Sequence, residues 1–386
     1  MRVLLAGPFE TEALRSTLSL RLGDAPPGSV QTPIVPLAAS LRQKGLRLEL
    51  VTLDPSIDKI QKFDEDGVLV TYVPMRGAPR HRARVRSLDF FAKEIAGLSL
   101  IMRESSADII HAHWTYEYAE AAVRTPRPHL VTMHDSGWHV LWFFRNFYRL
   151  IRLMMMLRVM PRAQRMTAVS PYIASLARFH GHFRNVAVIP NGVHLPGKVP
   201  IPRGWPAENP VLVAVGDQGR LKNIQAALEA FKEIRCSMQG AELHLFGPQL
   251  DSERLGRLPG VIGHGAVSHD RLMQFLSERA SLLIHPSLEE TFGVIIAEAK
   301  ARGIPCVAGE RSGGVPFTCG VDGGCELVDV RSPGAISRAT IEILMDRKRY
   351  EKMSRAARLD AESRFDIVKA TDQYIALYHR ILTDYR

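Results

Sequence analysis

Residues 285–299 read HPSLEETFGVIIAEA. An apolar run of strand type, residues 281–284, precedes this stretch, and residues 294–302 are a helix-forming run that Gly303 and Pro305 close. A polar turn therefore joins the carboxyl end of a predicted strand to the amino end of a predicted helix. In open α/β sheets ligands bind at that edge, and the amides of a helix amino end favour phosphate. The stretch predicts an α/β fold with an anion site at this turn.

Three backbone amides of the turn, those of Phe292, Gly293 and Val294, are expected to face the anion. Glu298 lies about 9 Å further along the predicted helix, at the usual rise per residue. Its neighbours are apolar. Because a buried, unpaired carboxylate is costly, we expect Glu298 to have a partner.

The pattern Pro-Ser-x-x-Glu-x-Phe-Gly, with a second glutamate eight positions after Glu290, resembles the signature of the GT4-type retaining glycosyltransferases of GT-B fold. Residues 301–308 and the pair Gly313-Gly314 match the same pattern. The resemblance implies an α/β fold of two Rossmann-like, doubly wound parallel-sheet domains that face each other across a cleft. It also implies transfer of a sugar, with retention, from a nucleotide diphosphate sugar to a hydroxyl acceptor. An ordinary buried helix with two incidental glutamates is the alternative.

The resemblance also implies roles for single residues of the donor site. Glu290 would reach the donor sugar, and Glu298 would bind the ribose hydroxyls. Lys222 would neutralise the diphosphate, unless it is a plain surface charge. The remaining donor contacts would come from the turn and from the stretch that meets the base, namely Thr291, Phe292, Gly293, Val294 and Val267.

One position departs from the family pattern. Gly216 is followed by Asp217, where the family usually has an arginine. An aspartate cannot neutralise a diphosphate, so we expect Arg220 to supply the missing cation, because a guanidinium can bind phosphate through two hydrogen bonds. In the alternative, Arg220 is solvated and the site is weak or inactive.

The amino-terminal half alternates between strand and helix signals. Strands are predicted at residues 2–7, 46–53 and 68–73, in the order of a doubly wound sheet. The stretch from Phe9 to Ser29 is predicted as a long loop, functional or mobile. Within it Gly28 and Ser29 resemble the family's glycine loop that approaches the donor, with a plain turn as the alternative. Residues 64–66, Asp-Glu-Asp, are predicted to form a solvated turn and not a metal site.

Two predicted strands, residues 108–114 and 130–135, end in histidines. His134 occupies the position at which a family histidine faces the donor sugar or the acceptor, so it is the candidate catalytic residue of this half, beside Glu290 and Lys222. His111 and His113 are either site residues or packing residues at a strand end. Asp135 either orients an imidazole or caps the next helix.

Two further segments combine basic and apolar residues. Residues 76–86 carry five arginines and form either the edge of the acceptor cleft or a solvated arm. Residues 142–160 are predicted to form one amphipathic helix that ends at Pro161. Its apolar face would hold Phe143, Phe147, Leu150, Ile151 and Met154, and its opposite face Arg145, Arg149 and Arg152. Such a helix either packs on its own domain or docks to an anionic membrane or lipid-linked acceptor.

A length of 386 residues predicts two domains. We expect an acceptor domain at residues 1–195, a linker rich in proline and glycine at 196–210 and a nucleotide-sugar domain at 211–365. By the same resemblance, the last helix, residues 366–386, would cross back to the first domain.

The charge and the motif content of the sequence favour some classes of function and exclude others. The net charge of +10 favours an anionic partner, which could be a phosphate donor, a lipid surface or nucleic acid. The chain lacks a G-x-G-x-x-G after a strand, and it lacks the interleaved aromatic and basic residues of an RNA-binding module, so we expect neither a dinucleotide oxidoreductase nor a nucleic-acid partner. A catalytically silent protein that binds a sugar nucleotide remains the alternative to the transferase.

The sequence also indicates the cellular location and the cofactors to be expected. The apolar runs of the sequence fall short of the ~20 residues of a membrane helix, and the short apolar run at the amino terminus is predicted to be a first strand and not a signal peptide. We therefore expect a cytoplasmic protein, with peripheral contact to the inner face of the membrane as an option. Four cysteines show neither C-x-x-C pairing nor histidines at ligand spacing. We therefore expect no metal and no cofactor other than the donor substrate.

Overall fold

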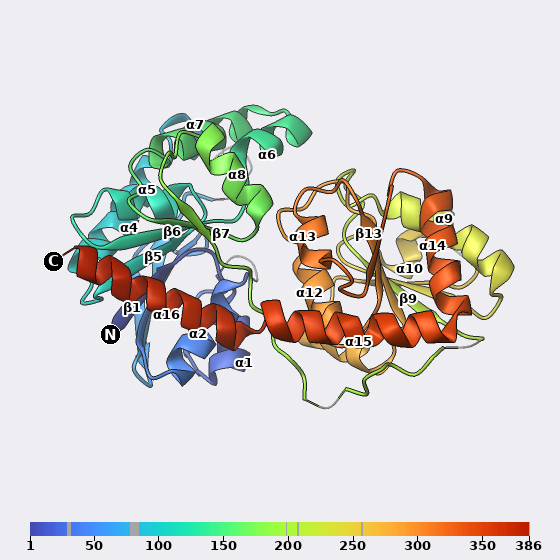
Figure 1. The fold of residues 1–386 in the computed structure, drawn as a ribbon. Helices are drawn as coiled ribbons and strands as arrows, with labels where there is room; N and C mark the ends of the chain where they lie inside the picture. Colours follow the sequence, from blue (N-terminus) through green and yellow to red (C-terminus); the bar gives the residue numbers. More distant parts are fainter. Residues whose placement is uncertain (29–31, 78–84, 198, 207, 256–257, 386) are drawn as a thin grey trace. The chain divides into compact units, whose positions relative to one another are not determined.

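The computed structural model describes residues 1–28, 32–77, 85–197, 199–206, 208–255 and 258–385. The chain forms two compact units (Figure 1). Unit 1 comprises residues 1–192 together with 367–386, and unit 2 comprises residues 193–366. Each unit is built around its own sheet, so each has its own core and its own strand ends.

The described residues of unit 1 form a sheet of order β3-β4-β2-β1-β5-β6-β7-β8. Neighbouring strands are parallel except β3 and β4, which are antiparallel. Going outward from β1, the order reverses between β1 and β5, as in a doubly wound fold. The strands are β1 Arg2–Ala6, β2 Arg47–Asp54, β3 Gln61–Glu65, β4 Val68–Pro74, β5 Ile109–His113, β6 His129–Met133, β7 Met166–Ala168 and β8 Val186–Val188.

Helices of unit 1 connect these strands, and one comes from the far end of the chain. They are α1 Thr11–Leu18, α2 Ile34–Gln43, α4 Ala92–Glu104, α5 Glu117–Val123, α6 Gly137–Phe144, α7 Phe147–Val159, α8 Pro171–Phe179 and α16 Ile367–Asp384. The helix α16 contributes Tyr374, Tyr378 and Ile381 to the same buried cluster as β1 and α2. The core of unit 1 is therefore completed by the carboxyl end of the sequence.

Two local predictions for unit 1 are wrong. The stretch from Phe9 to Ser29 is not one long loop, because residues 11–18 form α1 with Leu14 and Leu18 in the core. Asp64 and Glu65 lie in β3, an antiparallel edge strand, and only Asp66 and Gly67 form the turn into β4. Glu65 accepts hydrogen bonds from two backbone amides, those of Arg21 and Leu22, so it ties the α1 segment to the sheet edge.

The predicted single helix at 142–160 is also wrong. The chain forms α6 and α7 instead, and they are separated where Arg145 adopts a left-handed conformation with φ of 36°. Asn146 then caps α7 by accepting a hydrogen bond from the amide of Arg149 at 3.0 Å. Because Asn is a strong N-cap residue, this local bond favours starting a new helix over continuing the first.

Unit 2 is a six-stranded parallel sheet of order β11-β10-β9-β12-β13-β14 among the residues described. Numbered within the unit this is 3-2-1-4-5-6, the Rossmann order. The strands are β9 Val211–Val215, β10 Glu242–Phe246, β11 Val261–Gly265, β12 Leu282–His285, β13 Cys306–Gly309 and β14 Cys325–Val328. The helices are α9 Ile224–Ser237, α10 Ser252–Leu255, α11 His269–Glu278, α12 Val294–Lys300, α13 Val315–Cys319, α14 Pro333–Met345 and α15 Arg347–Arg364.

Both faces of the unit 2 sheet are buried. Successive residues of β9 illustrate this, since Leu212 and Ala214 join one apolar cluster with α9 and α14, whereas Val213 joins another with α11 and α12. A sheet covered on both faces offers its strand ends as the place where polar groups can gather. Separately, none of the described helices is long and apolar enough to span a bilayer.

Candidate active site

The carboxyl ends of β9 and β12 mark the point at which the strand order of unit 2 reverses. The two strands are hydrogen-bonded neighbours, and their connections run to opposite sides of the sheet. Lys222 lies in the loop after β9, and Glu290 lies in the loop after β12. The fold therefore places these two predicted site residues at the position where open α/β sheets bind ligands.

Lys222 and Glu290 form an ion pair, with 2.5 Å between Nζ and Oε1. The Glu290 side chain is 16% exposed and the Lys222 side chain 33%. A third residue, His285 at the end of β12, places its Nε2 at 3.5 Å from the same carboxylate oxygen. Burial alone raises the pKa of Glu290, but the contact with His285 and the charge of Lys222 outweigh burial and lower that pKa to about 2. Glu290 is therefore a carboxylate at neutral pH.

Backbone hydrogen bonds hold the loop that carries Glu290. The carbonyl of Glu290 accepts from the amide of Gly314 at 2.7 Å, and the Ser312 hydroxyl donates to the carbonyl of Ser287 at 2.6 Å. A side chain at Gly314 would collide with the loop, because its Cβ would lie 2.2 Å from the carbonyl oxygen of Thr291. The Gly313-Gly314 pair of the family pattern thus allows close backbone packing here.

The position of Lys222 is set by its neighbour Asn223. The Asn223 side-chain amide donates to the carbonyls of Pro286 and Val330, at 3.1 and 2.9 Å. Asn223 itself has a φ of 51°, a conformation that asparagine tolerates better than most residues. One side chain thereby ties the loop after β9 to the loop after β12, which brings the lysine to the glutamate.

Residues 291–294 form the tight turn that enters α12. The ring of Phe292 is buried against Phe365, with 5.3 Å between the ring centroids, so its side chain belongs to the core. Gly293 has a φ of 80°, which favours glycine, and Val294 begins the helix. Thr291 is partly buried. What Phe292 and Gly293 can offer a ligand is therefore their backbone.

Glu298 has the partner that its position requires, and this partner is His269. The His269 Nε2 lies 2.6 Å from the Glu298 carboxylate, and the glutamate side chain is 13% exposed. Burial lowers the pKa of His269. The hydrogen bond to Glu298 and the charge of that glutamate raise the pKa by more than burial lowers it, so the pKa of His269 lies above its ordinary value. The hydrogen bond to His269 fixes the direction of the Glu298 carboxyl group.

The other residues predicted to bind the donor lie at neighbouring strand ends of unit 2. Arg220 is exposed in the loop after β9, and among the described residues no ion pair joins it to a carboxylate. The Asp217 carboxylate accepts from the amide of Gly219 at 2.7 Å, so it shapes the loop. Val267 follows β11 and is partly buried against the α11 side of the core.

His134 lies in unit 1, at the carboxyl end of β6. Its Nε2 is 2.9 Å from Nδ1 of His113, and the ring stacks on Trp114 with centroids 4.3 Å apart. Burial lowers the pKa of His134 to about 3, and the pKa of His113 also lies well below its ordinary value. Both imidazoles are neutral at neutral pH, so His134 can donate or accept a hydrogen bond but carries no charge.

Two residues near His134, His111 and Asp135, form hydrogen bonds with other side chains of unit 1. His111 bridges the Tyr378 hydroxyl and the Thr132 hydroxyl, at 2.7 and 2.6 Å, so it is a packing residue. Asp135 accepts from the Tyr116 hydroxyl at 2.9 Å, and burial raises its pKa to about 6. Among the described residues, no hydrogen bond joins Asp135 to an imidazole, and the N-cap of α6 is Ser136.

Two further predictions concern loops of unit 1. The amide of Gly28 donates to Asp54 at 2.8 Å, and its φ is 77°, but Ser29 lies outside the described residues. Arg76 pairs with Asp89 and Glu94, so it is not available to an external anion. Most of the basic loop, residues 78–84, also lies outside the described part of the chain.

The two histidines of the unit 2 site, His269 and His285, received no role from sequence reasoning. His285 carried a weak signal, since it ends a strand beside the motif. His269 carried none that points to Glu298, because the two are 29 residues apart and meet only when α11 and α12 pack together. Among the described residues, no group of three histidine, cysteine or carboxylate side chains is placed to hold a metal ion.

Both halves of the chain match known protein families. Residues 200–360 match the family described as glycosyl transferases group 1, and residues 28–192 match the glycosyl transferase 4-like domain. The chain is 29% identical over 262 residues to the GDP-mannose-dependent alpha-(1-6)-phosphatidylinositol monomannoside mannosyltransferase of Mycobacterium tuberculosis, covering 61% of this chain and 66% of that protein. It is 25% identical over 183 residues to the N-acetyl-alpha-D-glucosaminyl L-malate synthase of Bacillus anthracis, covering 45% of this chain and 46% of that protein.

Solved structures extend the likeness to the whole chain. A sucrose-phosphate synthase from Thermosynechococcus elongatus matches with a TM-score of 0.77 and 19% identity, over all of both chains. Anabaena HepE, solved in complex with UDP and glucose, matches with a TM-score of 0.68 and 18% identity, over 98% of this chain and all of that one. At such identities the likeness establishes the fold, which is GT-B.

Proposed function

Because the chain belongs to the group 1 glycosyltransferases of GT4 type, we propose that it transfers a sugar, with retention, from a nucleoside diphosphate sugar to a hydroxyl group of an acceptor. The observation that carries the proposal is the contact between Lys222 and Glu290 at the switch point of unit 2. A cation and a carboxylate, held together at a strand end, suit a donor that bears a diphosphate next to a sugar.

In the proposed reaction the bond between the sugar and the diphosphate breaks, and negative charge grows on the departing phosphate. Lys222 and the backbone of residues 292–294 neutralise that charge. Glu290, ionised at neutral pH, accepts hydrogen bonds from sugar hydroxyls and so fixes the orientation of the reacting carbon. Glu298 accepts from the ribose hydroxyls, and Val267 packs against the base. Donor binding then replaces part of the contact between Lys222 and Glu290 with a contact to phosphate.

We propose that the acceptor binds unit 1 near His134, where a neutral imidazole stacks on Trp114. The name of the mycobacterial relative gives a phosphatidylinositol monomannoside as its acceptor. By analogy we propose a sugar or lipid-linked acceptor here, in polysaccharide or glycolipid assembly. We further propose that transfer needs no metal ion, since Lys222 supplies positive charge at the diphosphate; full activity in excess chelator is the expected result.

A thermal shift screen tests the donor proposal. UDP-, GDP- and ADP-sugars are added in turn, and one of them should raise the unfolding temperature, because a ligand of the native state stabilises it by mass action. The free nucleosides serve as controls, since they lack the diphosphate. No shift with any of these donors would refute nucleotide-sugar binding.

A second candidate, a catalytically silent binding protein, is favoured by one observation: Asp217 stands where the family usually has an arginine. The donor found in the screen is therefore incubated with the protein, and release of the free nucleoside diphosphate is measured with and without simple sugar acceptors. Hydrolysis or transfer supports the enzyme, whereas binding without either supports the silent protein.

A further inference from the structure

The pair of helices α6 and α7 exposes large apolar side chains at the surface of unit 1. Trp142 is 59% exposed, Phe147 57% and Phe144 50%. We call the exposed apolar set of these two helices the α6–α7 surface; it comprises Trp138, Trp142, Phe143, Phe144, Phe147, Leu150, Met154 and Leu157. Scattered apolar residues are normal on protein surfaces, but a contiguous group of this size marks an interaction site.

The exposed side chains of α7 form one stripe. Phe147, Leu150, Met154 and Leu157 are spaced by three or four residues, so they lie on the same side of the helix. The opposite side is buried, with Met155 and Met156 in the core. The helix is thus apolar on two sides, one packed on unit 1 and one open to solvent. Sequence periodicity could not separate these two sides, because both consist of the same residue types.

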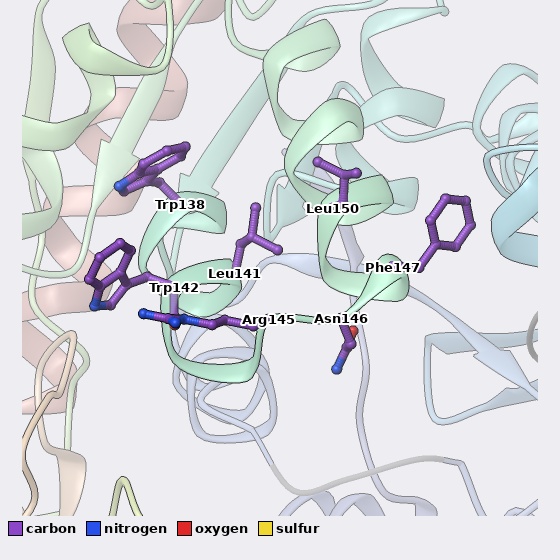
Figure 2. A pocket seen from close by; sticks show the side chains of 7 residues that line it. All are labelled: Trp138, Leu141, Trp142, Arg145, Asn146, Phe147 and Leu150. Carbon is purple, nitrogen blue, oxygen red and sulfur yellow. The ribbon is translucent and has the colours of Figure 1, made fainter.

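Figure 2 shows how the two helices meet. Trp138, Leu141 and Trp142 project from α6, and Phe147 and Leu150 project from α7, around a groove of about 370 Å³. Arg145 and Asn146 line the groove where the chain turns from one helix into the other. The wall is therefore mostly apolar, and its single charged lining residue is an arginine.

The charged side chains of the segment that carries this surface are all arginines. Residues 136–192 contain no aspartate, glutamate or lysine but eight arginines, at positions 145, 149, 152, 158, 162, 165, 178 and 184. Two of them lie over the exposed rings, with the guanidinium carbon of Arg145 at 4.8 Å from the Trp142 ring centre and that of Arg149 at 5.1 Å from the Phe144 ring centre. Within the described part of the chain, neither forms an ion pair with a carboxylate. By contrast, Arg152 pairs with Glu117 inside unit 1.

We propose that the α6–α7 surface docks on a bilayer that carries anionic lipid headgroups. Tryptophan and phenylalanine side chains partition into the boundary between headgroups and acyl chains, and arginines that flank them bind anionic headgroups. Arg145 and Arg149 are suited to this, because each already lies over the ring of an exposed aromatic side chain. A second copy of the same surface would bring two sets of unpaired arginines together, so charge disfavours self-association.

Flotation with lipid vesicles tests the proposal on the full chain without any donor. The protein should float with vesicles of phosphatidylglycerol and phosphatidylcholine at low salt and stay in solution with phosphatidylcholine alone, and added salt should release it. The double variant Arg145→Gln/Arg149→Gln should lose roughly 25-fold in the partition coefficient, at about fivefold for each basic residue near an anionic surface. The variant Trp142→Ser/Phe147→Ser should lose roughly tenfold or more.

Matched controls lie on α15 of unit 2. Arg347→Gln/Arg355→Gln removes the same charge, and Leu359→Ser removes an apolar side chain that is 64% exposed. Both control variants should float as the wild type does. Circular dichroism of every variant checks that the fold is retained, which is expected because all the substituted side chains are exposed or at the surface.

Tryptophan fluorescence gives a second readout. Trp138 and Trp142 lie on the α6–α7 surface, whereas Trp114 and Trp205 lie elsewhere. Anionic vesicles should shift the emission to the blue in the wild type and in Trp205→Phe. The shift should be lost in Trp138→Phe/Trp142→Phe, even though that variant should still float.

Three outcomes would overturn the proposal. The protein could stay in solution with anionic vesicles at low salt, the arginine and aromatic variants could float as well as the wild type, or the wild type could be a dimer that Trp142→Ser/Phe147→Ser dissociates. Because these measurements use neither donor nor acceptor, their failure leaves the proposed transferase activity untouched, and failure of the donor screen leaves the membrane proposal untouched.

Discussion

Replacing Glu290 with glutamine removes the charge of the buried partner while keeping the shape of the side chain. The folded protein holds the pKa of Glu290 at about 2, against an ordinary value of 4.5. At about 1.4 kcal/mol per pKa unit, this difference corresponds to about 3.5 kcal/mol of stability for the ionised form. The Lys222 end of the ion pair is one-third exposed, so solvent screens part of this, and we expect Glu290→Gln to lower the free energy of unfolding by about 2 kcal/mol near neutral pH.

The pH dependence of this effect has a definite sign. A carboxyl group whose pKa is depressed by folding contributes stability that is complete above its unfolded pKa and is lost as the pH falls through its folded pKa. The difference between the wild type and Glu290→Gln should thus be largest near neutral pH and should shrink below 4.5, towards about 2. Urea unfolding at several pH values measures it, provided that the denaturant slope is unchanged.

A matched control is available on α9. Glu229 also pairs with a lysine, Lys232, at 2.7 Å, but both side chains are exposed. Glu229→Gln should therefore leave the stability nearly unchanged at every pH. If Glu290→Gln were as stable as the wild type at neutral pH, or behaved like Glu229→Gln, the contacts with His285 and Lys222 would not be holding the carboxylate in the ionised state, and the pKa reasoning would be refuted.

Three further predictions concern the donor site. Glu298→Gln should raise the donor dissociation constant about tenfold, measured by calorimetric titration, while Glu290→Gln mainly lowers turnover; equal and small effects of both would contradict the roles assigned to them. Lys222→Ala and Arg220→Ala should each cost roughly 2 to 3 kcal/mol of transition-state stabilisation in a transfer assay. If Arg220→Ala transferred sugar at the wild-type rate while Lys222→Ala was strongly impaired, the diphosphate would be held without Arg220. His269→Asn should lower the free energy of unfolding below about pH 6.5, and its effect should become smaller as the pH rises through the raised pKa of His269. Urea unfolding measures this effect. A difference that does not change with pH would argue against the charged pair with Glu298.

The sequence predicted the two parallel sheets well, because their strands are short, strongly apolar runs. Residues 281–284 and 294–302, for example, were expected as strand and helix, and the structure has β12 at 282–285 and α12 at 294–300. The α1 helix and the edge strand β3 were missed because their side chains are only partly apolar. The break between α6 and α7 was missed because helical periodicity continues through Arg145. Its one signal was Asn146, a good N-cap residue in front of a second apolar run.

The candidate site was predictable to the extent that it is local in sequence. The turn and its two glutamates lie within nine residues of each other, so the motif could be read directly. Partners that come from other strand ends could not be derived, since their contact depends on packing. His269, 29 residues before Glu298, is one example, and Asn223, which fixes Lys222 by reaching two carbonyls of other loops, is another.

The helix α16 has a consequence for the way this protein is made. Tyr378 of α16 hydrogen-bonds His111 in the sheet of unit 1, and Tyr374 and Ile381 lie in the same core. During synthesis on the ribosome, residues 1–192 emerge first but lack these side chains until the last segment is translated. Unit 2, which is continuous from residue 193 to 366, can complete its own core earlier. We therefore expect the second unit to fold ahead of the first, with the nascent first unit exposing apolar surface to chaperones in the interval.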